Sequence, residues 1–167
     1  MHTLPSFAAQ VRDILKDDNT PAGRDKVAAL LRDALADRPF VESLFDDASP
    51  ERKVVYQDPQ LGFCILAHRY TDARNGPPHD HGPSWAIYGQ ADGETVMSDW
   101  DVIEPSAPGQ PGKVKKVREY ALAPGQAHVY NEGEVHAPSR AGPTRLVRIE
   151  GTNLEGVARG AYKPAAQ

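Results

Sequence analysis

The stretch GPPHDHGPSWAIYGQADG, residues 76–93, places two histidines one residue apart, just before an apolar run that ends in glycine. Side chains two residues apart point to the same face of an extended strand. A strand through this stretch therefore presents His79 and His81 in one direction and turns Asp80 away. Two imidazoles aimed together suit a single metal ion, so the stretch predicts a metal site whose third ligand comes from elsewhere in the chain.

Short apolar runs bounded by turn residues surround this stretch and predict strands. Fifteen prolines and fourteen glycines supply the turns. Many short antiparallel strands without helices between them predict a sandwich or a jelly-roll barrel. A further strand is expected to begin at His136. Residues 104–113 are expected to form an exposed loop, and residues 160–167 a loosely ordered end. The predicted strands are residues 53–58, 62–71, 84–90, 94–103, 116–123, 127–131 and 144–151.

The first fifty residues have a different pattern. Apolar residues recur at helical spacing in residues 4–17 and again in residues 21–47, and a proline at the start of the second segment suits a helix beginning. A short final helical turn is expected after Pro39. These helices carry no cluster of ionisable residues, so their expected role is packing. The predicted organisation is one domain, with a helical segment (1–49) packed on a metal-binding barrel (50–167).

Composition narrows the classes of partner. Nineteen basic and twenty-three acidic residues give a net charge of −4 with no basic block, which argues against nucleic acid or an anionic membrane as the partner. A single cysteine, Cys64, excludes an internal disulfide and fits a reducing compartment. The amino-terminal stretch lacks the apolar core of a secretory signal, and no segment is apolar for long enough to span a bilayer. We expect a cytoplasmic protein that acts on a small molecule.

A further histidine, His136, lies in the segment PGQAHVYNEGEVHAPSR (124–140), where glycines mark turns. With this segment the chain resembles the cupin superfamily, which has two histidine signatures. The first signature corresponds to His79-x-His81 followed by Gly93, and the second to Gly125, Asn131-x-Gly133 and His136. The resemblance covers roughly residues 60–150 and implies a double-stranded β-helix (jelly-roll barrel) with the metal inside, held by His79, His81 and His136. His128 is the alternative third ligand, although we expect both His128 and His68 to be hydrogen-bonded barrel residues.

Ala86 stands where most metal-binding cupins carry a glutamate ligand. Among the branches without that acid, the chain looks like the cysteine dioxygenase type of thiol dioxygenase, which shares the histidine pair, a serine at the position of Ser84 and an aromatic residue at that of Phe63. The resemblance implies Fe(2+) held by three histidines, with a thiol and O2 as substrates. Zinc, nickel and manganese remain alternatives. Barrels of this superfamily often pair, so a homodimer remains open.

The residues that bind substrate are less well defined by the resemblance. The arginine of the family that holds the substrate carboxylate falls near Arg52, and its catalytic tyrosine falls near Glu150, so that tyrosine is absent. Arg148 is a second candidate, although strand alternation favours a charged outer face for Leu146, Arg148 and Glu150. The pocket candidates are Ser84, Trp85 and Ile87. Trp85 and Ile87 are included because an even number of residues separates them from the histidines, which places side chains on the same face of a continuous strand.

The predicted function is a mononuclear non-haem iron dioxygenase that adds O2 to a small thiol-containing substrate. One alternative keeps the three-histidine iron but cleaves a carbon substrate such as a diketone or an aromatic diol. Another is a cupin that binds a metal or small ligand without turnover. Oxygen consumption separates the enzymes from the binder, and oxidation of sulfur in the product separates the two enzymes.

Overall fold

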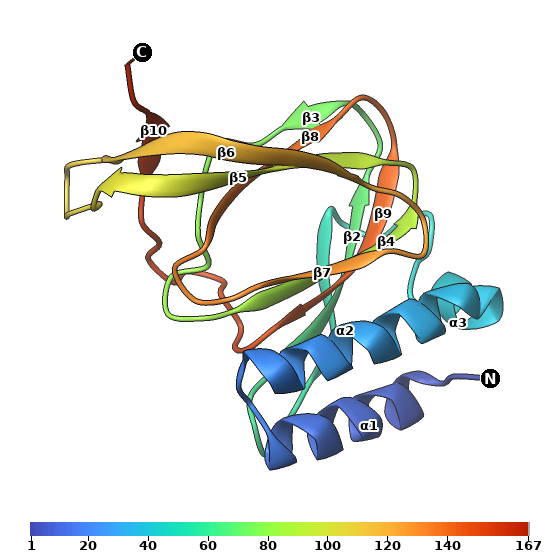
Figure 1. Ribbon diagram of the computed structural model, residues 1–167. Coiled ribbons are helices and arrows are strands. Elements are labelled where there is room, and N and C mark those ends of the chain that lie inside the picture. The colour runs from blue at the N-terminus through green and yellow to red at the C-terminus, as the bar shows by residue number, and fades with distance from the viewer. Residues whose placement is uncertain (167) are drawn as a thin grey trace.

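The computed structural model describes residues 1–166 and consists of two five-stranded sheets with helices on the outside of one of them (Figure 1). The strand orders are β1-β2-β9-β4-β7 and β10-β6-β5-β8-β3. The sheets face each other and share an interior cluster to which both contribute side chains. The predicted fold class, a jelly-roll barrel with an N-terminal helical segment, is confirmed. The strands are β1 (Arg52–Gln57), β2 (Cys64–Tyr70), β3 (Arg74–Asn75), β4 (Ala86–Asp92), β5 (Thr95–Glu104), β6 (Gly112–Leu122), β7 (Ala127–Tyr130), β8 (Val135–Arg140), β9 (Thr144–Glu150) and β10 (Tyr162–Pro164).

Three expectations about the backbone need correction. His79 and His81 do not lie on a regular strand: they belong to a loop that ends where β4 begins at Ala86. β6 starts four residues earlier than expected, at Gly112. Residues 160–166 are not loose, because β10 pairs in parallel with β6 and the Tyr162 hydroxyl donates to Asp80 at 2.8 Å; Gln167 lies outside the described residues. These contacts join segments far apart in the sequence, so no local pattern predicts them.

The predicted helices are present as α1 (Leu4–Asp17), α2 (Pro21–Ala36) and α3 (Arg38–Ser43). The side chain of Thr3 accepts the backbone N–H of Ser6, which satisfies one of the free donors at the start of α1. Each helix has a proline in its first turn, where the missing N–H costs no hydrogen bond. None of the helices in residues 1–166 is long and apolar enough to cross a membrane.

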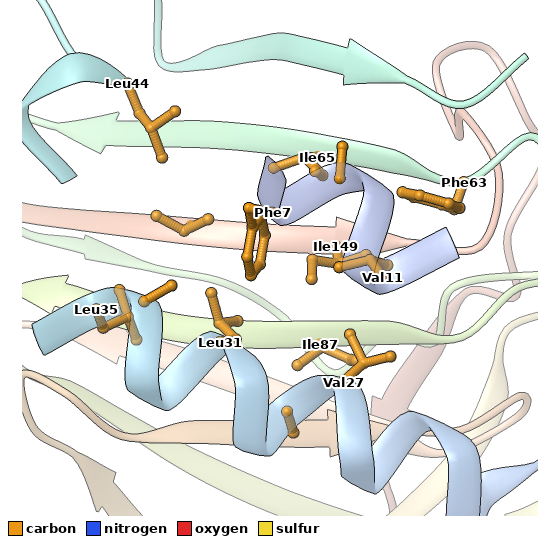
Figure 2. Close-up of a cluster of buried hydrophobic side chains, with 14 of the residues drawn as sticks. Phe7, Val11, Val27, Leu31, Leu35, Leu44, Phe63, Ile65, Ile87 and Ile149 are labelled. Carbon is orange, nitrogen blue, oxygen red and sulfur yellow. The ribbon is translucent and has the colours of Figure 1, made fainter. Parts of the chain in front are cut away.

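The helices bury one face of the sheet that contains β2, β9 and β4. Figure 2 shows Ile65, Ile149 and Ile87 from these strands packed against apolar side chains of the helices. The three isoleucines are register partners across the sheet, so they form one continuous row. Because successive side chains of a strand alternate between faces, the neighbouring residues point into the barrel. Arg148 and Tyr88 are register partners in that interior row.

Candidate metal centre

Three histidines from two distant segments meet in the barrel. His79 and His81 come from the loop before β4, and His136 is the second residue of β8. The backbone N–H of His79 donates to the carbonyl of His136 at 2.9 Å, and the reverse bond is 3.0 Å, so the loop is held directly against β8. One nitrogen from each ring lies within 4.8 Å of the others. The structure therefore brings together the three residues that the resemblance to the cupin signatures implies as metal ligands.

The outer nitrogens of two of these rings contact backbone carbonyls. Nδ1 of His79 lies 2.9 Å from the Pro77 carbonyl, and Nδ1 of His136 lies 3.0 Å from the Glu134 carbonyl. A carbonyl oxygen only accepts hydrogen bonds, so each Nδ1 carries the hydrogen and each Nε2 keeps a lone pair. Both lone pairs face the interior of the cluster, as in histidines that bind a metal through Nε2.

Burial keeps the three rings neutral. It lowers the pKa of His79 to about 4. Burial also lowers the pKa of His81 and His136, and the positive charge of Arg148 acts in the same direction on both. Neutral imidazole is the form that coordinates a metal, so near neutral pH no proton competes for these nitrogens.

The cluster also contains a tyrosine that is not among the pocket candidates from the sequence. The hydroxyl oxygen of Tyr88 lies 2.8 Å from Nε2 of His81, 3.1 Å from Nε2 of His136 and 3.5 Å from Nε2 of His79. Nε2 of His81 and Nε2 of His136 are themselves 3.1 Å apart. Four electron-rich atoms thus converge with few hydrogens between them, a donor set that fits a metal cation.

Two charged side chains of β9 lie inside the barrel beside this cluster. The guanidinium carbon of Arg148 is 4.0 Å from the centre of the Tyr88 ring. Glu150 is fully buried, with one carboxylate oxygen 3.7 Å from Arg148 and the other 3.4 Å from Arg52. The expected charged outer face for Leu146, Arg148 and Glu150 is wrong, because the helices cover the opposite face and require its apolar residues there.

Arg52 occupies a different position from Arg148. Its guanidinium donates to Asn153 Oδ1 at 3.1 Å and to Glu150 at 3.4 Å, and its side chain is 29% exposed. Arg148 is almost fully buried, and its Nε has no hydrogen-bond partner among the described residues. Arg52 therefore lies at the rim of the barrel, whereas Arg148 lies next to the histidine cluster.

A second buried arginine adds positive charge to the interior. Arg140, at the end of β8, is 3% exposed and has two guanidinium nitrogens without partners in the described part of the chain. Its guanidinium packs over the Tyr70 ring at 4.4 Å. His68 contacts the Tyr70 hydroxyl through Nδ1 at 3.4 Å, and His128 lies between the rings of Tyr120 and Tyr130. Neither of these two histidines belongs to the three-histidine group.

Two of the three pocket candidates face the helices rather than the converging nitrogens. Ile87 and Trp85 belong to the core shared with the helices, and the Arg24 guanidinium of α2 lies 5.2 Å from the Trp85 ring. Ser84 is buried and donates to the Trp85 carbonyl at 2.9 Å. The parity argument for Trp85 and Ile87 is wrong, because the loop after His81 is not extended and the alternation does not continue through it.

A signal for Tyr88 was nevertheless present in the sequence. Ala86 corresponds to an acid in the cupin signature that the sequence resembles, and a side chain two residues later on a strand shares its face. Counting parity from Ala86, rather than from the histidines, places Tyr88 in the barrel. Both residues do belong to the interior cluster.

No family model matches the sequence, and no curated protein matches it. Among solved structures, the chain is similar to a cupin superfamily protein of Desulfitobacterium hafniense, at 15% identity and TM-score 0.45 over 64% of this chain and 83% of that one. It is also similar to a hydroquinone 1,2-dioxygenase in complex with Cd2+ and 4-hydroxybenzonitrile, at 17% identity and TM-score 0.48 over 62% of this chain and 66% of that one. A third similar structure is an oxalate oxidase in complex with the substrate analogue glycolate, at 16% identity and TM-score 0.46 over 67% of this chain and 57% of that one. Likenesses at this level carry no information about activity.

Proposed function

We propose that this chain is a mononuclear non-haem iron dioxygenase of the thiol dioxygenase type, which adds O2 to a small thiol. The observation that supports it best is the buried group of three neutral imidazoles, in which no carboxylate takes part among the described residues. Three neutral imidazoles leave a divalent ion its full charge, and even one anionic ligand from the protein would leave it net positive, which favours an anionic donor such as a thiolate. Three histidines also suit zinc, so the metal must be identified by experiment.

The proposed reaction converts R–SH and O2 into the sulfinic acid R–SO2H. Both oxygen atoms form bonds to sulfur, and the four electrons that sulfur loses reduce the O2 molecule. Bound ferrous iron would supply the redox chemistry that O2 requires. The protein's part is to orient the reactants and exclude water, which its buried His81, Tyr88 and His136 are suited to do.

A substrate carboxylate would be held by Arg148 rather than by Arg52. Arg148 lies over the Tyr88 ring and its Nε is unpartnered, so it has a donor available close to the histidines. Arg52 already donates to Asn153 and Glu150. A buried guanidinium is well suited to a carboxylate because its donors lie in a rigid plane.

The test is O2 uptake by protein purified without air and loaded with ferrous iron. Uptake should require a small thiol, and mass spectrometry should show two oxygen atoms added to its sulfur. Uptake with diketones or aromatic diols but not with thiols would overturn the proposal in favour of a carbon-cleaving enzyme. Metal binding without uptake on either substrate class would identify a binding protein.

A further inference from the structure

Tyr88 occupies an unusual position for a buried tyrosine. It lies in the middle of β4, is 1% exposed, and directs its hydroxyl at the Nε2 atoms of all three histidines. The neighbouring buried tyrosine, Tyr130, instead pairs its hydroxyl with that of Tyr120. The orientation of Tyr88 is therefore specific to the cluster and not a general feature of the barrel core.

Hydrogen bonding alone does not account for these contacts. The hydroxyl of Tyr88 has one hydrogen and can donate it to one nitrogen only. Nε2 of His79 and Nε2 of His136 both carry lone pairs, because their Nδ1 atoms donate to carbonyls. Tyr88 can therefore donate in either its 3.1 Å contact with His136 or its 3.5 Å contact with His79, and the other contact sets a lone pair against a lone pair in a buried site, which is unfavourable unless a cation lies between them.

We infer that Tyr88 is a fourth protein ligand of the metal and binds it through its phenolate oxygen. Two ligand atoms about 2.1 Å from one ion lie about 3.0 Å apart at a right angle and about 3.4 Å apart at a tetrahedral angle. The contacts of 2.8, 3.1 and 3.5 Å span this range. On binding, the phenol would lose its proton to solvent and form an oxygen–metal bond, with no change of oxidation state.

The charges around Tyr88 are consistent with this role. Ala86, two residues before Tyr88 on the same interior face, offers no donor atom, so the Tyr88 hydroxyl is the oxygen that β4 directs at the histidines. The Arg148 guanidinium, 4.0 Å from the ring centre, stabilises negative charge on the phenolate.

The role of Tyr88 as a ligand requires only a bound metal, whereas its consequence for the substrate rests on the proposed thiol dioxygenase function. Four protein ligands leave two positions in a six-coordinate centre. One would serve the thiolate and the other O2, so the substrate would attach through sulfur alone. Any carboxylate on it must then be held by the protein, at Arg148.

The experiment loads the protein with ferrous iron and oxidises the iron by one electron with ferricyanide. A phenolate bound to ferric iron gives a visible charge-transfer band, and resonance Raman excitation in that band enhances the phenolate ring modes. We expect both signals in the unmodified protein. Tyr88→Phe should abolish them and weaken iron binding by about tenfold or more, as loss of a metal contact does.

Tyr130→Phe is the matched control. It also removes one buried hydroxyl next to His136, whose ring centre is 4.0 Å away, but that hydroxyl contacts Tyr120 and not a histidine. It should keep the band. A near-ultraviolet difference spectrum during zinc titration provides a second measurement on the unmodified protein, because one tyrosine should ionise as zinc binds.

The outcomes separate this inference from the proposed function. Stoichiometric iron without a phenolate signal, or a signal that persists in Tyr88→Phe, would overturn the role of Tyr88 and leave the dioxygenase proposal standing. Failure of the unmodified protein to bind any metal would overturn both.

Discussion

The sheet that contains β2, β9 and β4 is buried on both faces, but one face carries apolar side chains and the other carries polar and charged ones. On the outer face, Ile65, Ile149 and Ile87 form a dry apolar row beneath the helices (Figure 2). Tyr88 and Arg148 are the chain neighbours of Ile87 and Ile149 and point to the opposite face. They form an interior row that contacts the histidine cluster and a buried carboxylate.

This contrast separates stability from function within the same two strands. Burial of the isoleucines stabilises the fold with about 25 cal/mol for each square ångström of apolar surface removed from water. Burial of the interior groups costs desolvation energy unless they are paired or bind a ligand. Variants on the outer face should therefore change stability with little effect on metal binding, and variants inside the barrel should do the reverse.

The largest effect is expected from removing an interior ligand. His136→Ala should reduce metal occupancy to background, since loss of even an outer partner of a ligand costs about 10–100-fold in affinity. Metal analysis after anaerobic loading measures this, and His79→Ala and His81→Ala should behave alike. His128→Ala is the control and should retain metal. Loss of metal in the His128 variant with retention in the His136 variant would show that the third ligand is misassigned.

On the outer face, Ile149→Ala should destabilise the metal-free protein by roughly 2–5 kcal/mol, because it leaves a cavity in a fully buried row. Urea denaturation measures the free energy of unfolding. Metal affinity of the folded variant should stay within a few fold of the unmodified value. A collapse of metal affinity without loss of stability would mean that the two faces are not independent.

The metal-free protein should lose stability as the pH falls from about 6.5 towards 4. The pKa of His79 is lowered to about 4 by burial, so between these pH values the unfolded chain binds more protons than the folded one. Stability then rises with pH, and His79 alone would account for roughly 2 kcal/mol between pH 5 and pH 7. Denaturation curves at both pH values test this; His79→Asn should show a weaker dependence, and an equal slope in both proteins would contradict it.

The smallest effect is expected at the substrate-binding arginine. Arg148→Met should raise the Michaelis constant for a carboxylate-bearing thiol by about tenfold, the loss of one hydrogen-bonded charge pair, when the variant is assayed at full iron loading. Arg52→Ala should have a milder effect, since Arg52 lies at the rim. A thiol amide serves as the matched substrate, and its kinetics should differ little among the three proteins. Equal kinetics for acid and amide in the unmodified protein would exclude a carboxylate partner at either arginine.

Much of this organisation could be predicted from local patterns. Helical periodicity located α1 and α2, and alternation bounded by turn residues located most strands. The spacing of His79 and His81 indicated a shared ligand, and the resemblance to the cupin signatures added His136. The position of Tyr88 was missed because parity was counted through a loop, and β10 was missed because its pairing partner lies about fifty residues earlier.

By itself, the sequence determined the repeat of apolar residues in each helix and strand and the residue types that each segment carries. A period of two divides β4 and β9 into two faces, but it does not say which face meets the helices and which meets the barrel interior. Only the tertiary structure decided this, because packing of α1 and α2 against the isoleucine row turned Tyr88, Arg148 and Glu150 inward. The same packing placed a phenol and a guanidinium beside the three histidines, a chemistry that no single segment of the chain contains.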